Sequence, residues 1–160
     1  MVKVKENKEV HFFGLDMARI VKLYMGILAK RLEHLDIDRY YFLLLIIDHS
    51  ESPFTQQQLC HQLKIDKTVM VRIVDYLSKK GYLIREPNQE DRRSYFLTLT
   101  AKAKKDMPYI KAVVEELDQV ATLNMNKSDV SSFCNALSKV KENLKNEPSH
   151  SMVVRYKKVK

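Results

Sequence analysis

The segment between residues 55 and 81 most constrains the fold, because it predicts two helices joined by a short turn. Thr55 followed by Gln58 has the form of a capping box, in which two side chains satisfy free amides at the start of a helix. Asp66 is placed to accept hydrogen bonds at the start of the second helix. Gly81 then supplies the residue that most readily ends a helix in the left-handed conformation. The segment is therefore predicted to be a helix-turn-helix.

The second predicted helix has two distinct faces. Its apolar residues recur at helical spacing, at Met70, Ile73, Val74 and Leu77. The opposite face carries Thr68, Arg72, Asp75 and Lys79. We expect Asp75 to pair with Arg72 and Lys79 on its own helix, each pair contributing roughly a few tenths of a kcal/mol. One face should thus pack in a core while the other faces outward.

A two-stranded hairpin is predicted to follow directly. The sequence reads YLIRE, then a charged loop PNQEDRR, then SYFLTLT. Tyr82 and Ile84 alternate on the first strand, and Tyr95, Leu97 and Leu99 alternate on the second. Helix, turn, helix and hairpin in this order indicate a winged helix-turn-helix, whose second helix can enter a DNA major groove. Residues 38–100 are therefore predicted to form a winged helix-turn-helix DNA-binding domain.

Amphipathic helices are predicted on both sides of this domain. Residues 10–36 have apolar positions at steps of three and four and are assigned as an N-terminal dimerisation helix. The next helix, beginning near Asp38, is apolar on almost every side and should be buried. Residues 101–147 are assigned as C-terminal dimerisation helices, with a kink or break at Pro108, and residues 148–160 as a basic tail. The fold class is mainly α, or α+β when the wing is counted.

The charge balance favours a polyanionic partner. The 160 residues include 28 Lys and Arg against 20 Asp and Glu, a formal net charge of +8 at pH 7. Neutralising phosphates with Lys and Arg releases condensed counterions, so such an excess favours binding to nucleic acid. Part of the excess lies in the tail, at Arg155, Lys157, Lys158 and Lys160. Because such tails are more often solvated ends than binding arms, the charge alone does not establish the partner.

The sequence shows no pattern for a metal, a cofactor or catalysis. Cys60 and Cys134 stand far apart without a CxxC motif, so both are expected to be reduced. The five histidines show no HxxxH spacing. Because a glycine-rich phosphate loop and a nucleophile with a local signature are also lacking, we expect no cofactor and no enzyme.

No membrane association is expected either. No apolar run approaches the roughly 18 residues that a membrane-spanning helix needs. Residues 1–10, MVKVKENKEV, lack the apolar region of a signal peptide. We therefore expect a cytoplasmic protein.

Two stretches carry a resemblance to a known family. The wing sequence DRRSYFLTLT contributes Asp91, Arg93, Leu99 and Thr100. The second helix contributes Lys67, Thr68, Arg72, Ile73, Val74, Asp75, Leu77 and Gly81. On these residues the sequence resembles the MarR family of winged-helix transcriptional regulators. It differs at Ala103, where the family often has glycine, and at Val71, where the family often has serine or threonine.

The resemblance implies a role in DNA binding for several polar residues. Arg93 is expected to reach into the minor groove, where a narrow A·T-rich stretch concentrates negative potential, and Asp91 is expected to hold its guanidinium. Lys67 and Arg92 are assigned to phosphates. The remaining candidates are Thr68, Val71 and Arg72 at the major-groove edge, and Gln56 and Gln57 at the DNA backbone.

By the same resemblance, we expect a homodimeric repressor on a pseudo-palindromic DNA operator, with half-sites about one helical turn apart. A small aromatic or anionic effector would release it by binding between the dimer helices and the DNA-binding lobe. The candidates for lining that pocket are Tyr24, His34, Tyr40, Tyr41 and Arg72. The alternative is a winged-helix interaction module whose hairpin and basic tail bind a protein, without a specific DNA site.

Overall fold

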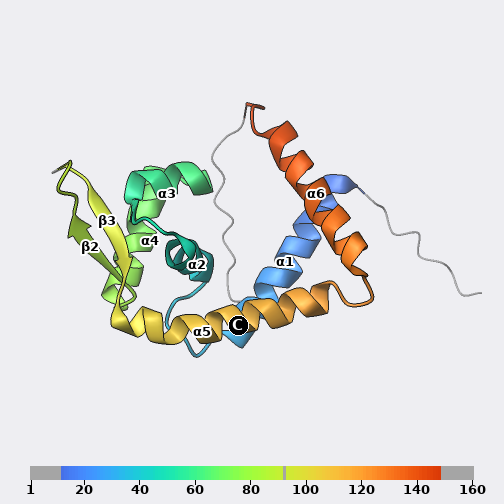
Figure 1. The fold of residues 1–160 in the computed structure, drawn as a ribbon, viewed down its shortest axis with the longest axis horizontal. Coiled ribbons are helices and arrows are strands. Elements are labelled where there is room, and N and C mark those ends of the chain that lie inside the picture. Colours follow the sequence, from blue (N-terminus) through green and yellow to red (C-terminus); the bar gives the residue numbers. More distant parts are fainter. Residues whose placement is uncertain (1–11, 92, 149–160) are drawn as a thin grey trace, which may run out of the picture.

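A computed structural model describes residues 12–91 and 93–148, which form six helices and three strands (Figure 1). The helices are α1 (Phe13–Arg31), α2 (Tyr41–His49), α3 (Gln56–Leu63), α4 (Lys67–Lys79), α5 (Ala101–Ala121) and α6 (Lys127–Leu144). The strands are β1 (Phe54–Thr55), β2 (Leu83–Pro87) and β3 (Tyr95–Leu99). This order confirms the predicted fold class, a winged helix-turn-helix with flanking helices.

The strands form an antiparallel sheet in the order β1-β3-β2. In the hairpin, Leu83 lies opposite Leu99, and in the other pair Phe54 lies opposite Leu97. Strand β1 is not predicted from the sequence, because two residues are too few to show an alternating pattern. Since β1 ends where α3 begins, it fixes the start of the helix-turn-helix against the hairpin.

The helix-turn-helix, the hairpin and α2 form one lobe of the molecule. Within it, the start of α3 and the end of α4 are set by the residues that the sequence predicts. The Thr55 hydroxyl accepts from the Gln58 backbone N–H at 3.3 Å, and Gln58 Oε1 accepts from the Thr55 N–H at 2.7 Å. Gly81 has a φ of 75°, in the left-handed region. Asp66 occupies the N-cap of α4, but its side chain makes no cap hydrogen bond within the described chain. Its carbonyl instead begins the helix by accepting from Met70 N–H at 2.9 Å.

The core of the lobe is formed by α2, α3, α4, the sheet and the first half of α5. The predicted α4 stripe is buried, as are Tyr41, Leu43, Leu44 and Ile47 of α2. Helix α2 begins at Tyr41 and not near Asp38, because Asp38 has a φ of 50° and lies in the preceding turn. Phe42 stays 37% exposed, so the expectation that α2 is buried on every side is wrong.

On β2, Leu83 faces the core in place of the predicted Ile84. Leu83 is 1% exposed and Ile84 is 45% exposed. Tyr82 is also buried, but it precedes the strand and lies in the turn after α4. The expected alternation from Tyr82 is therefore shifted by one residue, which moves the inward positions to the other set of side chains. On β3, Leu97 and Leu99 are buried as predicted.

A kink or a break is predicted at Pro108; helix α5 continues through this residue, so the break does not occur. Proline removes one helical hydrogen bond and crowds the carbonyl four residues earlier. The Pro108 ring is exposed, while Met107 and Ile110 on either side of it are buried. Because both parts of the helix bury their apolar side chains, packing maintains the helical course across the proline.

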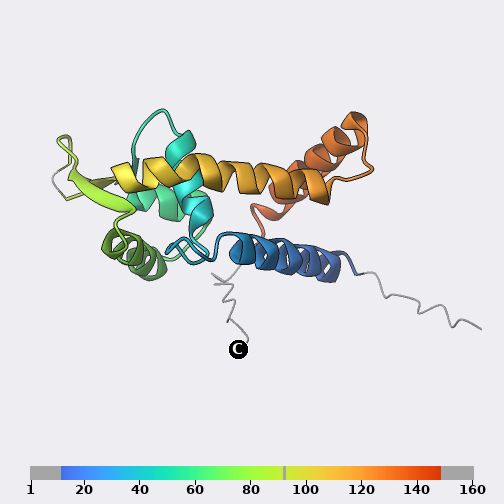
Figure 2. The same cartoon turned by 90° about the horizontal axis from the view of Figure 1, so that it is seen from below.

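Helices α1 and α5 leave the lobe side by side, and α6 turns back from the far end of α5 (Figures 1 and 2). The Tyr24 hydroxyl donates to Asp118 at 2.6 Å, which joins α1 to α5. Helix α6, which the structure describes throughout, has no buried residue. The large exposed apolar residues of α1 and α6 include Phe13, Ile20, Leu23, Phe133, Leu137 and Leu144. These two helices therefore carry apolar faces that lack a covering layer within the described chain.

Candidate DNA-binding site

A groove of about 350 Å³ lies between the helix-turn-helix and the wing. It is lined by Thr55, Gln56, Gln57, Cys60, Lys67, Arg85, Arg93, Ser94, Tyr95 and Leu97. Four of the predicted DNA-binding residues meet here: Gln56 and Gln57 from α3, Lys67 from α4, and Arg93 from the wing. Cations and amides on one concave surface suit the phosphates and sugars of a nucleic-acid backbone.

The starts of two helices contribute to this groove. Gln56 and Gln57 form the first turn of α3, directly after the Thr55 cap, and Lys67 is the first residue of α4. Free backbone N–H groups and the helix dipole make the start of a helix favourable for an anion. The local fold thus adds backbone donors to the charge of Lys67.

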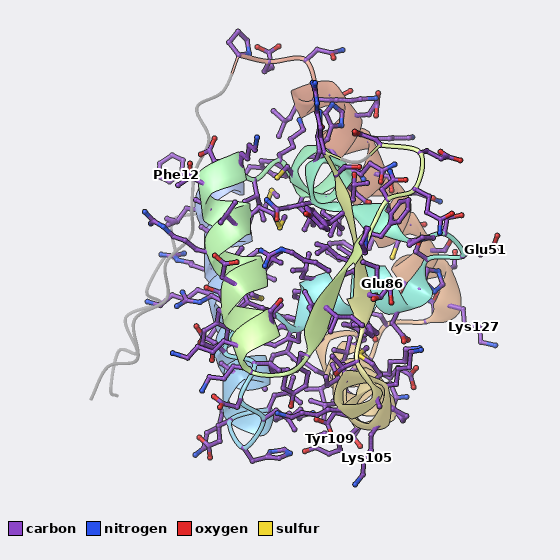
Figure 3. The ribbon with its side chains drawn as sticks, turned by 90° about the vertical axis from the view of Figure 1, so that its left-hand side faces the viewer. Phe12, Glu51, Glu86, Lys105, Tyr109 and Lys127 are labelled. Carbon is purple, nitrogen blue, oxygen red and sulfur yellow. The ribbon has the colours of Figure 1, made fainter. Side chains whose placement is uncertain are left out.

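The outer face of α4 carries the residues predicted to read bases. Thr68, Val71 and Arg72 are exposed, opposite the buried apolar stripe of the same helix. Figure 3 shows α4 and the hairpin side by side, with Glu86 labelled on β2. Arg72 can donate two hydrogen bonds to guanine, whereas Val71 offers only a methyl contact, which suits thymine.

Arg85 lines the groove but is not among the predicted residues. Its Nη2 donates to Asp75 Oδ1 at 2.6 Å, which joins α4 to β2. The expected pairs of Asp75 with Arg72 and Lys79 are therefore replaced by a pair across the lobe. Asp75 points toward the hairpin, and there an arginine from β2 meets it.

The register of the hairpin explains this position of Arg85. Side chains two residues apart on a strand share a face, and Leu83 is buried. Arg85 lies opposite Leu97, which is also buried, so it belongs to the inner face of the hairpin. The sequence prediction places Tyr82 and Ile84 on the inner face of this strand. It therefore assigns Arg85 to the outer face, which is wrong.

The wing tip is closed by a compact set of hydrogen bonds. Asn88 N–H donates to the Ser94 carbonyl at 3.2 Å, and Ser94 N–H donates to the Asp91 carbonyl at 2.9 Å. Asp91 Oδ1 accepts from the backbone N–H of Arg93 at 3.0 Å. Asp91 therefore shapes the turn that carries Arg93, whereas the sequence predicted that it would hold the guanidinium. A carboxylate two residues before an amide can close such a turn locally, leaving the Arg93 side chain exposed.

Two further predictions concern residues near the wing. Asp91 lines a second hollow, beside Gln57 and His61, so it stays next to the groove. Arg92 lies outside the described residues, as do the four basic residues of the tail from position 155 onward. Their assignments stay predictions.

Cys60 lies in the groove, partly buried. Burial raises the pKa of its thiol, which keeps the thiol protonated and poorly nucleophilic at neutral pH. Within residues 12–91 and 93–148, no group of three or more His, Cys, Asp or Glu side chains is arranged to hold a metal ion. Over the same part of the chain, no helix is long and apolar enough to cross a membrane.

Two of the predicted ligand-binding residues lie where α1 and the following turn meet α5. The hydroxyl of Tyr24 donates to Asp118, and burial followed by this hydrogen bond raises the pKa of Tyr24 above its ordinary value. The ring of His34 lies 5.1 Å from that of Tyr109, in an edge arrangement. Both residues therefore contact α5.

The other three predicted ligand-binding residues lie elsewhere. The ring of Tyr40 lies 5.4 Å from that of Tyr76 on α4. Tyr41 is fully buried, and its hydroxyl contacts Met25 Sδ at 3.6 Å. Arg72 lies on the outer face of α4, among the DNA-binding candidates. The ligand-binding assignment stays a prediction.

Comparison with known proteins gives a consistent family. Residues 37–94 match the family model for the MarR family. A MarR transcriptional regulator from Methanosarcina mazei Go1 is 27% identical, with a TM-score of 0.76, and the match covers 82% of this chain and 95% of that one. A MarR family transcriptional regulator from Listeria monocytogenes, complexed with a 26mer DNA, is 25% identical with a TM-score of 0.76, covering 84% and 90%.

A third structure, wild-type MarR in its apo form from E. coli, is 26% identical with a TM-score of 0.65, and the match covers 82% of this chain and 98% of that one. The family and these neighbours are transcriptional regulators rather than enzymes. The family match covers the helix-turn-helix and the wing as far as Ser94, and the structural matches extend over the flanking helices. The family match over residues 37–94 and these structural neighbours together support a winged helix-turn-helix transcriptional regulator of the MarR family.

Proposed function

We propose that this protein is a homodimeric repressor that binds a pseudo-palindromic DNA operator in a sequence-specific manner and is released by a small aromatic or anionic ligand. The observation that carries the proposal is the groove, because it joins Gln56, Gln57, Lys67 and Arg93 from three separate elements. In that arrangement α4 enters the major groove while the wing brings Arg93 to the neighbouring minor groove. The Listeria monocytogenes relative, solved with DNA, supports the same partner.

Dimerisation is supported by the uncovered apolar faces of α1 and α6. Leu23 is 66% exposed and Leu137 is 41% exposed, although each lies on an apolar stripe. Burying such surface stabilises by about 25 cal/mol per Å², so a second copy would gain by covering it. A two-fold dimer then presents two recognition helices to two half-sites.

Release by a ligand is proposed at the boundary between the dimer helices and the lobe. Tyr24, His34 and Tyr40 lie along that boundary and already take part in contacts between aromatic rings or with a carboxylate. An aromatic ligand that binds among them would replace these contacts. It would shift the protein away from the DNA-bound state only by its difference in affinity between the two states.

The test is selection of bound fragments from random duplexes, followed by anisotropy titrations at several salt concentrations. Arg72→Ala is expected to cost about 1–3 kcal/mol and to relax specificity at one base position. Arg93→Ala is expected to weaken binding to every sequence and to reduce the salt slope by about 1. Lys105→Ala is the control, because Lys105 is exposed on α5 and lines no part of the groove (Figure 3).

The alternative function, a protein-interaction module, makes the opposite prediction. Selection would then enrich no sequence, and Arg72→Ala and Arg93→Ala would leave duplex affinity unchanged at moderate salt.

Ligand release has a test of its own. A panel of aromatic carboxylates, added to the preformed protein–DNA complex, should dissociate that complex. If no compound dissociates the complex, the proposal of ligand release is wrong, while the proposal of DNA binding is unaffected.

A further inference from the structure

The last turn of α4, the recognition helix of the proposed function, is held by the connection between α1 and α2. Lys80, the C-cap residue of α4, pairs with Asp36 in that connection, with 2.5 Å between Nζ and Oδ2. The hydrogen bond from Lys80 lowers the pKa of Asp36 below its ordinary value. Ile37, next to Asp36, is fully buried, so the connection is anchored in the core. Asp36 therefore holds Lys80 from a fixed point.

An aromatic contact strengthens the same attachment. The rings of Tyr40 and Tyr76 meet edge to face, 5.4 Å apart, between the connection and α4. Lys80 Nζ lies 5.8 Å from the centre of the Tyr76 ring. The α1–α2 connection thus contacts the last turn of α4 at two residues.

Helix α5 holds the end of α4 from another direction. Lys102 Nζ donates to the Lys80 carbonyl at 2.9 Å and lies 4.3 Å from the centre of the Tyr82 ring. The Tyr82 hydroxyl donates to Asp106 at 2.8 Å. The end of α4 is therefore bound both to the α1–α2 connection and to the first two turns of α5.

We propose that this clamp, made of Asp36, Tyr40, Tyr76, Lys80 and Lys102, fixes the angle of α4 to α1 and α5 and so sets the half-site spacing that the dimer accepts. The inference rests on the proposed function. In a two-fold dimer built on the flanking helices, the distance between recognition helices depends on how each lobe is oriented. Asp36 and Lys80 act as positioning residues, because they affect DNA binding through the orientation of α4 and not by contacting DNA.

The exposure of the ion pair distinguishes positioning from simple stabilisation. The side chains of Lys80 and Asp36 are 33% and 59% exposed. Ion pairs this open to water contribute little to the free energy of unfolding. Removing the pair should therefore change the preferred spacing while the protein remains folded.

The test compares duplexes that carry the selected half-sites at the best spacing and at one base pair more and fewer. Asp36→Asn and Lys80→Gln are each expected to lower affinity at the best spacing by about fivefold and to reduce the preference among the three spacings. The double variant Asp36→Lys with Lys80→Asp restores the pair with reversed charges and should recover the preference. Lys79→Gln removes the same charge beside the clamp and should change all three affinities by one common factor.

Two measurements keep the outcomes separate. Urea denaturation checks that each variant is folded, with Lys80→Arg as the conservative replacement should Lys80→Gln be unfolded. A carboxyl NMR titration should show a higher pKa for Asp36 in Lys80→Gln than in the wild type. The wild type could prefer one half-site spacing while the folded Asp36→Asn and Lys80→Gln variants show the same preference. That result would overturn the clamp but leave the proposed function standing. A wild type that binds no duplex would overturn the proposed function, and the clamp with it.

Discussion

At the scale of single residues, Arg85 can make two interactions at once. A guanidinium carries five N–H donors in a planar fork, so one edge can bond Asp75 while others face the groove. Arg85 does line the groove, together with Lys67 and Arg93. The Asp75 side chain is 57% exposed, so the pair contributes only about 0–1 kcal/mol to folding. Its main effect should be on the orientation of the guanidinium toward DNA.

Replacing Arg85 should therefore alter DNA binding more than stability. Arg85→Gln is expected to weaken duplex binding and to lower the slope of log affinity against log salt by about 1, because one phosphate contact is lost. Asp75→Asn retains the cation and should weaken binding with the slope unchanged. Salt-dependent anisotropy measures both. An Arg85→Gln protein with the wild-type slope and affinity would show that the pair only joins α4 to β2.

At the scale of elements, the end of α4 depends on the backbone of Gly81. Its φ of 75° lies in the left-handed region, where a side chain is strained whatever space is available. An added Cβ would meet only Lys102 Cδ, at 3.9 Å, which is an ordinary contact. The strain would come from the backbone alone, at about 1–2 kcal/mol.

Two glycine replacements should therefore act in opposite directions. Gly81→Ala is expected to lower the free energy of unfolding by about 1–2 kcal/mol. Gly26→Ala, inside α1 with no atom within 4 Å of the new Cβ, is expected to raise it by about 0.5–1 kcal/mol. Urea denaturation of both variants gives the comparison. Equal stability of Gly81→Ala and the wild type would mean that α4 ends in another conformation.

The elements that could be predicted from the sequence are those specified by neighbouring residues. The Thr55 and Gln58 capping box and the helix end at Gly81 depend on contacts within a few positions. They can therefore be predicted from the sequence alone. Strand β1 depends on pairing with β3, which is distant in sequence. Pro108 shows the converse, because a strong local signal for a kink or a break does not end the helix when apolar side chains are buried on both sides of it.

The same distinction applies to the candidate site. The resemblance to the MarR family identified residues that share one groove, including Lys67 and Arg93. It did not supply Arg85, because that assignment requires the register of β2 against β3. The role of Asp91 at the backbone of Arg93 also required the structure, since both contacts fit the same two-residue spacing.

At the scale of the whole molecule, the flanking helices have the composition of an interface rather than of a surface. Helix α6 has Phe133, Leu137 and Leu144 at helical spacing, and they are 46%, 41% and 58% exposed. An apolar row of this kind on a helix that buries nothing is typical of a contact with another molecule. In the proposed dimer, covering it joins two lobes, and the operator then binds both at once.

A charged residue introduced into this apolar row of α6 should separate the two copies and, as a result, weaken DNA binding. Leu137→Glu is expected to shift the sedimentation coefficient from dimer to monomer at micromolar concentration. Because the second half-site then no longer binds intramolecularly, affinity for the full operator should fall by about 100-fold or more, while affinity for one half-site changes little. Asn135→Glu adds the same charge on the opposite face of α6 and should leave both measurements at wild-type values. If Leu137→Glu stays dimeric with full operator affinity, the interface must lie on other residues; if the wild type is itself a monomer, one lobe must recognise DNA alone.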